Sequence, residues 1–204
     1  GSDWQDIYVM NVDNKSKLKD VINYSKFSGI AWKGDEGFYY SGYDKPDEKN
    51  KFSAKTEFQK IFFHKIGTAQ SEDQLIYEDK EHPLRYKGVG ISEDERWLMM
   101  SLSEGTDGSE LQFLDLNNPE QKEFKMLSKG FDINQDFIDN VDGLFYVYTN
   151  YEAPNYKVVM IDPANPSPTA WKTIIPEKEN KLDAVHRVGN KLFCSYLVNA
   201  CSKV

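Results

Sequence analysis

The feature that most constrains the fold is a run of apolar, β-forming residues that follows a turn and recurs along the chain. The equivalent large apolar residues are Phe38, Trp97, Leu144 and Leu192, which lie 59, 47 and 48 residues apart. A period of about 40 to 50 residues, with several strands and hairpin turns in each unit, is typical of β-propeller blades. The sequence therefore predicts an all-β fold, a partial β-propeller of about four blades.

Short apolar runs bounded by Gly, Asp, Asn or Pro predict the individual strands. We expect strands that include residues 7–10, 37–40, 60–63, 97–100, 111–114, 144–147, 157–160 and 191–194. One stretch also fits helical spacing, through Ala54, Phe58, Ile61, Phe62 and Lys65. The repeat favours a strand there, because the run after Phe38 corresponds to the run after Trp97. Asp-Gly and Gly-Asn pairs mark tight hairpin turns, since these residues adopt positive φ at little cost.

The period divides the chain, residues 1–204, into blades at approximately 1–50, 51–103, 104–150 and 151–204. The first unit begins inside an apparent strand near Trp4, and the last stops soon after the run that ends at Leu197. A blade buries its faces only against neighbouring blades. The chain is therefore either a small closed ring or part of a larger one. In an unclosed ring, open blade edges would lead to self-association.

Composition excludes several classes of protein. The chain has 25 basic and 33 acidic residues, which gives a net charge of −8. Because a surface that binds nucleic acid needs an excess of basic residues, we expect no binding to nucleic acid. No apolar run approaches the roughly 18 to 20 residues that cross a bilayer, and the first residues lack a basic start and an apolar stretch. We expect no membrane partner. The sequence favours a cytoplasmic location, and a periplasmic one stays open if the full-length chain carries a signal peptide.

Tests for chemistry are negative. The chain contains no G-x-S-x-G nucleophile motif, and its three histidines, His64, His82 and His186, lack metal-ligand spacing. The segment 132–136 resembles the start of a calcium loop, but Phe137 replaces the required glycine and Gly143 the bidentate glutamate. We expect no catalytic residue, no metal and no cofactor. The two cysteines, Cys194 and Cys201, are expected to be buried free thiols.

The amino-acid sequence of the repeats is similar to that of the propeller in the prolyl oligopeptidase family. The segments that carry the resemblance are 26–32 (KFSGIAW), 37–41 (GFYYS), 64–73 (HKIGTAQSED), 91–98 (ISEDERWL), 103–105 (SEG), 148–150 (YTN) and 153–156 (APNY). The resemblance runs from Gly1 to about residue 197. The segment 64–73 is its most specific part.

The resemblance implies a serine endopeptidase that cleaves short peptides after proline. In the family, a seven-bladed propeller caps an α/β-hydrolase domain that carries the Ser, Asp and His triad. The chain would then be a propeller portion without the catalytic domain, inactive alone, which forms the lid and wall of the substrate chamber. Its implied partners are short proline-containing peptides and the missing α/β-hydrolase domain of the same polypeptide.

Two site residues are carried over by the resemblance. Phe27 matches an aromatic residue that lines the pocket for the substrate residue two before the proline, and its alternative is a blade-core aromatic. Asp3 matches an acidic residue that meets the positive amino end of a peptide, and its alternative is a solvated terminal charge. Three other chamber positions depart from the pattern of the animal enzymes, and we assign no role to Ser103, Thr106 or Tyr86.

Two further hypotheses stay open. The chain could be a stand-alone β-propeller interaction module that binds a protein or a glycan on its central face. It could also belong to a dipeptidyl-peptidase-like or acylaminoacyl-peptidase-like member of the same superfamily. An open reading frame that continues into a G-x-S-x-G segment separates the first of these from the oligopeptidase. The preference of the full-length protein for internal or for N-terminal proline substrates separates the second from the oligopeptidase.

Overall fold

The computed structural model of the chain describes residues 3–45 and 56–204. The chain forms two compact units, Gly1–Ile91 and Ser92–Val204. Both consist of antiparallel strands, and the helical turns among the described residues are η1 (Gln70–Glu72) and η2 (Pro168–Ala170). This confirms the predicted all-β class.

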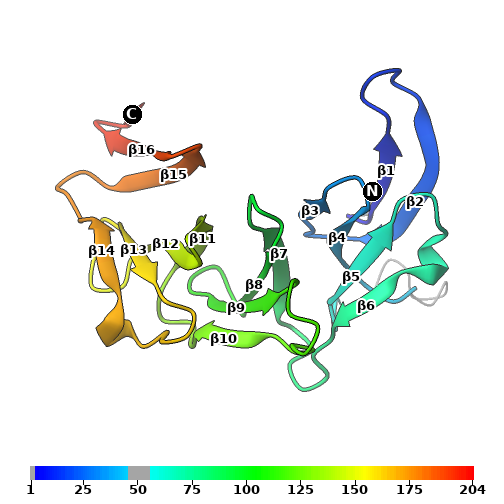
Figure 1. The fold of residues 1–204 in the computed structure, drawn as a ribbon, viewed down its shortest axis with the longest axis horizontal. Coiled ribbons are helices and arrows are strands. Elements are labelled where there is room, and N and C mark those ends of the chain that lie inside the picture. The colour runs from blue at the N-terminus through cyan, green and yellow to red at the C-terminus, as the bar shows by residue number, and fades with distance from the viewer. Residues whose placement is uncertain (1–2, 46–55) are drawn as a thin grey trace. The chain divides into compact units, whose positions relative to one another are not determined.

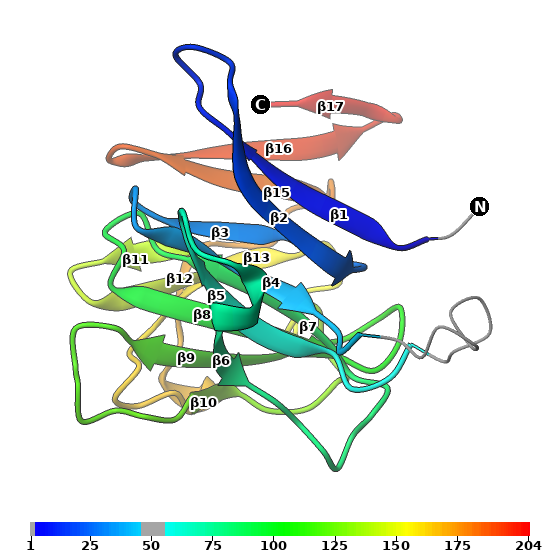
Figure 2. The same cartoon turned by 90° about the vertical axis from the view of Figure 1, so that its right-hand side faces the viewer.

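The first unit contains a hairpin, a four-stranded sheet and a further strand (Figure 1). β1 (Gln5–Met10) and β2 (Lys17–Ser25) form the hairpin, a long two-stranded ribbon in Figure 2. The sheet has strand order β3-β4-β5-β6. Its strands and the one after it are β3 (Ile30–Lys33), β4 (Gly37–Gly42), β5 (Lys60–Lys65), β6 (Gln74–Tyr77) and β7 (Tyr86–Ile91). β7 contacts β3, β4 and β5.

Strand β4 forms the centre of the first unit and is buried along its whole length. Phe38 and Tyr40 of β4 pack with Val9 and Ile22 of the hairpin, which joins the hairpin to the sheet. The strand begins with a glycine for a steric reason, because a Cβ at Gly37 would lie 2.1 Å from the backbone oxygen of His64.

The second unit contains three groups of paired strands. The first runs through β8 (Trp97–Ser103), β9 (Glu110–Asp115) and β10 (Lys125–Ser128). The second is β11 (Gln135–Val141), β12 (Leu144–Thr149), β13 (Lys157–Ile161) and β14 (Lys172–Ile175). The third is β15 (Leu182–Val188), β16 (Lys191–Val198) and β17 (Cys201–Lys203).

Aromatic side chains fill the core of the second unit. Trp97, Phe113 and Phe145 meet edge to face, with ring centroids 4.9 to 5.8 Å apart. Val147 and Ile161 are buried in the same cluster. Edge-to-face geometry places the positive ring edge against the negative face of its neighbour, which adds attraction to the burial of apolar area.

The predicted strands are confirmed, since each of the eight expected runs lies in a strand. Residues 60–65 form β5, which supports the strand over the helix, although Ala54 lies outside the described residues. The Asp142-Gly143 turn is confirmed as well. Val141 pairs with Leu144, and the two residues between them have φ of 54° and 79°, the positive values of a two-residue hairpin loop.

The pairing groups the strands differently from the segments predicted by the period. The divisions at 103/104 and 150/151 separate β8 from β9 and β12 from β13, whereas each of these pairs is hydrogen-bonded. The division at 50/51 lies outside the described residues, as do Gly1 and Ser2. The physical reason is that a period fixes the spacing of repeated units but leaves open where one unit ends.

The cysteine prediction is correct in one respect and wrong in another. Both thiols are free, as expected. Cys194 on β16 is half-buried, but Cys201 on the edge strand β17 is exposed. All three residues of β17 are exposed, which shows that neither face of this strand is covered among the described residues.

Candidate functional site

Phe27 lies in the loop between β2 and β3 and is 62% exposed, so it is not a core aromatic. Its φ of 52° is in the left-handed region, which a bulky side chain adopts only with strain of about 1–3 kcal/mol. Hydrogen bonds hold the loop in this conformation. The Ser28 hydroxyl accepts from the Ser41 backbone N–H at 2.9 Å, and the Gln59 side-chain amide donates to the Lys26 carbonyl at 3.1 Å.

Tyr86, the first residue of β7, contacts Phe27 in a T-shaped arrangement, with ring centroids 5.4 Å apart. The buried side chain of Gln59 connects the two segments, because its oxygen also accepts from the Lys87 backbone N–H at 2.6 Å. One amide group thus fixes the backbone next to both aromatic rings. No local sequence pattern marks the contact of Tyr86 with Phe27 or its support by Gln59, because these segments lie far apart in the chain.

Lys26 brings Asp3 close to Phe27. The Lys26 ammonium lies 3.4 Å from the Asp3 carboxylate, 5.1 Å from the centre of the Phe27 ring and 5.9 Å from the centre of the Trp4 ring. The Lys26 side chain is 16% exposed and that of Asp3 is 79% exposed. We call Asp3, Trp4, Lys26, Phe27 and Tyr86 the Phe27 site. The two residues predicted from the resemblance therefore lie in one cluster, and their roles stay predictions.

Trp4 continues the Phe27 site into a second group of rings. It meets Tyr43 edge to face at 5.5 Å and Tyr24 at 6.4 Å. The Tyr43 hydroxyl is buried without a hydrogen-bond partner among the described residues, and burial raises its pKa. The phenol therefore stays protonated at neutral pH and keeps a hydrogen that it can donate.

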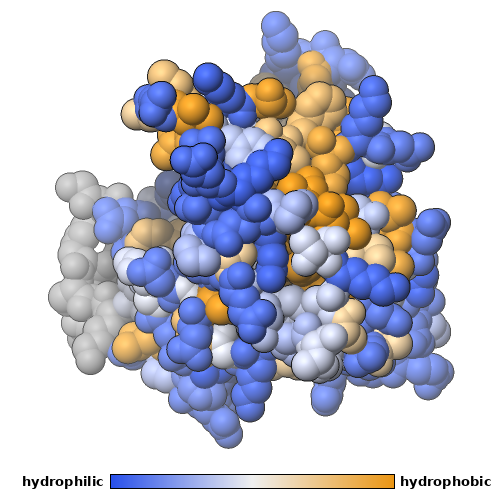
Figure 3. All heavy atoms as spheres, turned by 90° about the vertical axis from the view of Figure 1, so that its left-hand side faces the viewer, coloured by the Kyte–Doolittle hydropathy of each residue, from blue (hydrophilic) through white to orange (hydrophobic). Residues whose placement is uncertain are grey.

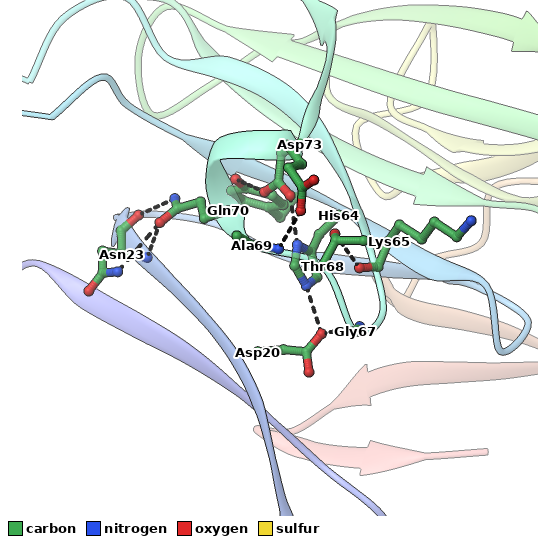
Figure 4. A network of polar contacts seen from close by, with 11 residues as sticks. Asp20, Asn23, His64, Lys65, Gly67, Thr68, Ala69, Gln70 and Asp73 are labelled. Atoms are coloured by element: carbon green, nitrogen blue, oxygen red, sulfur yellow. Dashed lines mark hydrogen bonds and ion pairs between the residues drawn. The ribbon is translucent and has the colours of Figure 1, made fainter.

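His64 is the centre of a buried polar network in the first unit (Figure 4). Its Nε2 lies 3.0 Å from Asp20 Oδ1, and its Nδ1 lies 2.7 Å from Asp73 Oδ1. The Tyr40 hydroxyl donates to the other oxygen of Asp73 at 2.7 Å. Since ionised carboxylates only accept hydrogen bonds, a His64 ring nitrogen that carries a hydrogen can donate to the acid that it faces.

The network joins β2 of the hairpin to the sheet. Burial by itself would raise the pKa of Asp20, but hydrogen bonds from the Gly67 backbone N–H and from His64 lower it below its ordinary value. Gln70 adds a second connection, because it accepts from the Asn23 N–H and donates to the Asn23 carbonyl, both at 3.0 Å. His64 is fully buried and pairs with both acids, so its contacts are those of a structural residue.

The other two histidines lie in separate places. His82 is half-exposed and contacts Asp79 three residues earlier, and His186 is on β15. Among residues 3–45 and 56–204, no group of three His, Cys, Asp or Glu side chains could hold a metal ion. In the same ranges, no helix is long and apolar enough to cross a membrane.

The repeated antiparallel sheets joined by hairpin turns place the chain in the class of β-propeller domains. Residues 1–204 match the family model described as the prolyl oligopeptidase N-terminal β-propeller domain, and the chain belongs to this family.

Relatives match over the whole chain. A prolyl endopeptidase of Elizabethkingia meningoseptica is 38% identical over 204 residues, which are 100% of this chain and 28% of that protein. A prolyl oligopeptidase A of Amanita bisporigera is 31% identical, over 94% of this chain and 28% of its own length. The chain thus spans less than a third of the length of these relatives.

Solved structures agree with the sequence matches. A chain from a study of two prolyl endopeptidases superposes with a TM-score of 0.86 at 31% identity, over 99% of this chain and 28% of its own. Prolyl oligopeptidase B from Galerina marginata, bound to a 35-residue hydrolysis and macrocyclization substrate, superposes with a TM-score of 0.86 at 28% identity, over 98% of this chain and 30% of its own.

Proposed function

We propose that the chain is the substrate-gating propeller portion of a serine endopeptidase that cleaves short peptides after proline. The observation that carries the proposal is the family match over all 204 residues, together with 38% identity to a prolyl endopeptidase over the same span. The Phe27 site supports it, because two exposed aromatic rings held by a shared buried amide form a rigid apolar surface suited to a peptide side chain.

In this proposal the chain contributes binding and enclosure, and the α/β-hydrolase domain of the same polypeptide contributes the reacting groups. The propeller forms the wall and lid of a chamber that admits short flexible peptides and excludes folded proteins. Enclosure removes water from the reacting groups, and the aromatic surface aligns the peptide over the triad. Residues 1–204 alone are then inactive. In this proposal, about four of seven blades lie in this chain.

The stand-alone interaction module is not favoured, because the relatives that match the whole chain are named as endopeptidases and oligopeptidases. The test uses the protein encoded by the complete gene. We expect it to cleave internal X-Pro-X peptides and to lose activity as the substrates become folded proteins. A strong preference for N-terminal X-Pro dipeptide substrates would instead assign it to the dipeptidyl-peptidase-like members. If the gene stops after Val204, the stand-alone interaction module becomes the favoured function.

A further inference from the structure

Lys26 is the cationic member of the Phe27 site. Its ammonium lies within 6 Å of the centres of two rings, Trp4 and Phe27. Aromatic rings attract a cation through their negative faces, which keeps the ammonium at the rings. The side chain is 16% exposed, so the ammonium is largely removed from bulk water yet still accessible.

Among residues 3–45 and 56–204, the hydrogen-bond capacity of Lys26 is poorly used. An ammonium has three donors, and the partners of Lys26 in these ranges are the Thr56 hydroxyl and the Asp3 carboxylate, each at 3.4 Å. Charged hydrogen bonds of this type are normally about 2.7–2.9 Å long. Asp3 is 79% exposed and near the chain terminus, and an ion pair to such a group contributes little because water screens it. The site therefore keeps a cation that a better-placed carboxylate could bind.

We propose that Lys26 is a specificity-determining residue that selects peptides with an acidic side chain two residues before the proline, and that Asp3 acts as a tethered competitor for the same ammonium. The inference rests on the proposed function and names the substrate class for its site. It gives Asp3 a role different from the expected one, because a carboxylate that faces Lys26 repels an acidic ligand from the same ammonium.

The experiment compares isosteric peptides on the full-length protein. Acetyl-X-Ala-Pro substrates with a fluorescent leaving group are prepared with X as Glu, Gln or Lys, and kcat/KM is measured at low and high salt. We expect Glu to exceed Gln by about three- to fivefold at low salt, and the preference to shrink at high salt. Lys should be the poorest of the three. Because kcat/KM for the Glu and Gln peptides is compared within one variant, an effect of the substitution on folding or on the position of Phe27 cancels from their ratio.

Substitutions then assign the preference. In Lys26→Met, which keeps the apolar stem, the Glu to Gln ratio should fall to one or below. In Lys26→Arg it should persist, and in Asp3→Asn it should rise. Lys33→Met is the matched control, because Lys33 also lies 5.9 Å from a ring, that of Phe63, and pairs with Glu36. It should leave the ratio unchanged. A wild-type ratio retained in Lys26→Met would overturn the inference.

A binding measurement separates the inference from the proposed function. Calorimetry with acetyl-Glu-Ala-Pro-amide and its Gln counterpart gives the ratio of their dissociation constants without turnover. If no substrate is cleaved after proline, the proposed function is wrong, while tighter binding of the Glu peptide that depends on Lys26 still supports the inference. Equal binding of the two amides to the wild type overturns it, whether or not cleavage occurs.

Discussion

The two units build their cores from different chemistry. In the first, His64 is buried between two carboxylates that connect the hairpin to the sheet. In the second, three aromatic rings pack edge to face, and the guanidinium of Arg96 lies 4.4 Å from the centre of the Trp97 ring. An apolar cluster is insensitive to pH, whereas a buried ion network is stable only while its groups hold their charges. Related strand patterns therefore give two cores that should respond differently to acid.

The largest effect is expected from removing a ring of the apolar core. Phe145→Ala leaves a cavity beside Trp97 and Phe113, and such truncations lower the free energy of unfolding by about 3–5 kcal/mol. Urea unfolding followed by tryptophan fluorescence measures the loss, which should be the same at pH 7 and pH 4. Val188→Ala, at a position 64% exposed, is the control and should change stability by less than about 1 kcal/mol.

Asp20→Asn breaks the ionic core of the first unit. Removing one acid leaves His64 with Asp73 as its single carboxylate partner, and we expect a loss of about 2–3 kcal/mol at pH 7. The pKa of Asp20 is lowered in the folded state, so its contribution is complete above the ordinary value of about 3.9 and disappears as pH falls through the lowered value. The difference between wild type and variant should therefore narrow below pH 4.

Measurement of urea midpoints at pH 7, 5 and 3 tests this behaviour. Asp44→Asn is the matched control, because Asp44 pairs with Lys60 at the surface and its side chain is 74% exposed. It should change stability by no more than about 1 kcal/mol. A penalty for Asp20→Asn that is constant down to pH 3 would contradict an ionic role and make the two cores alike.

A third substitution should stabilise the first unit. Lys87 on β7 is buried, and its ammonium donates to the Arg85 carbonyl at 3.1 Å. Burial lowers its pKa, so between the lowered and the ordinary value the unfolded chain binds more protons and stability rises with pH. Lys87→Met removes the buried charge and should raise the free energy of unfolding by about 1 kcal/mol at pH 7.

Thermal unfolding at pH 7 and pH 10 tests the sign of this effect. The advantage of Lys87→Met should be smaller at pH 10, where the wild-type lysine is closer to neutral in both states. Lys60→Met serves as the comparison, since Lys60 pairs with the exposed Asp44 and should lose stability slightly on substitution. If the stability advantage of Lys87→Met over the wild type instead grows with pH, the buried Lys87 ammonium stabilises the folded state.

The strands and the tight turns could be predicted from the sequence because they depend on local chemistry. Asp142 and Gly143 accept positive φ, and the run from Leu144 has β-forming side chains. The Phe27 site could be predicted only in part. The resemblance identified Phe27, but its contact with Tyr86 depends on Gln59, which bridges two segments that are distant in the chain. The exposure of Cys201 depends on which strands lie beside β17, and no local pattern encodes this.

The smallest expected change in folding stability comes from a substitution in the sheet β15–β17 of the second unit. Val188, Phe193 and Leu197 are exposed on its strands, and hydrophobic side chains reach the surface in Figure 3. Exposed apolar side chains and an unpaired strand edge favour association, so we expect residues 1–204 to self-associate. Phe193→Lys should weaken association while changing stability by no more than about 1 kcal/mol, because the ring is already 45% exposed. Light scattering over a range of concentrations measures the association. A monodisperse 23.6 kDa species at every concentration would contradict the expected self-association.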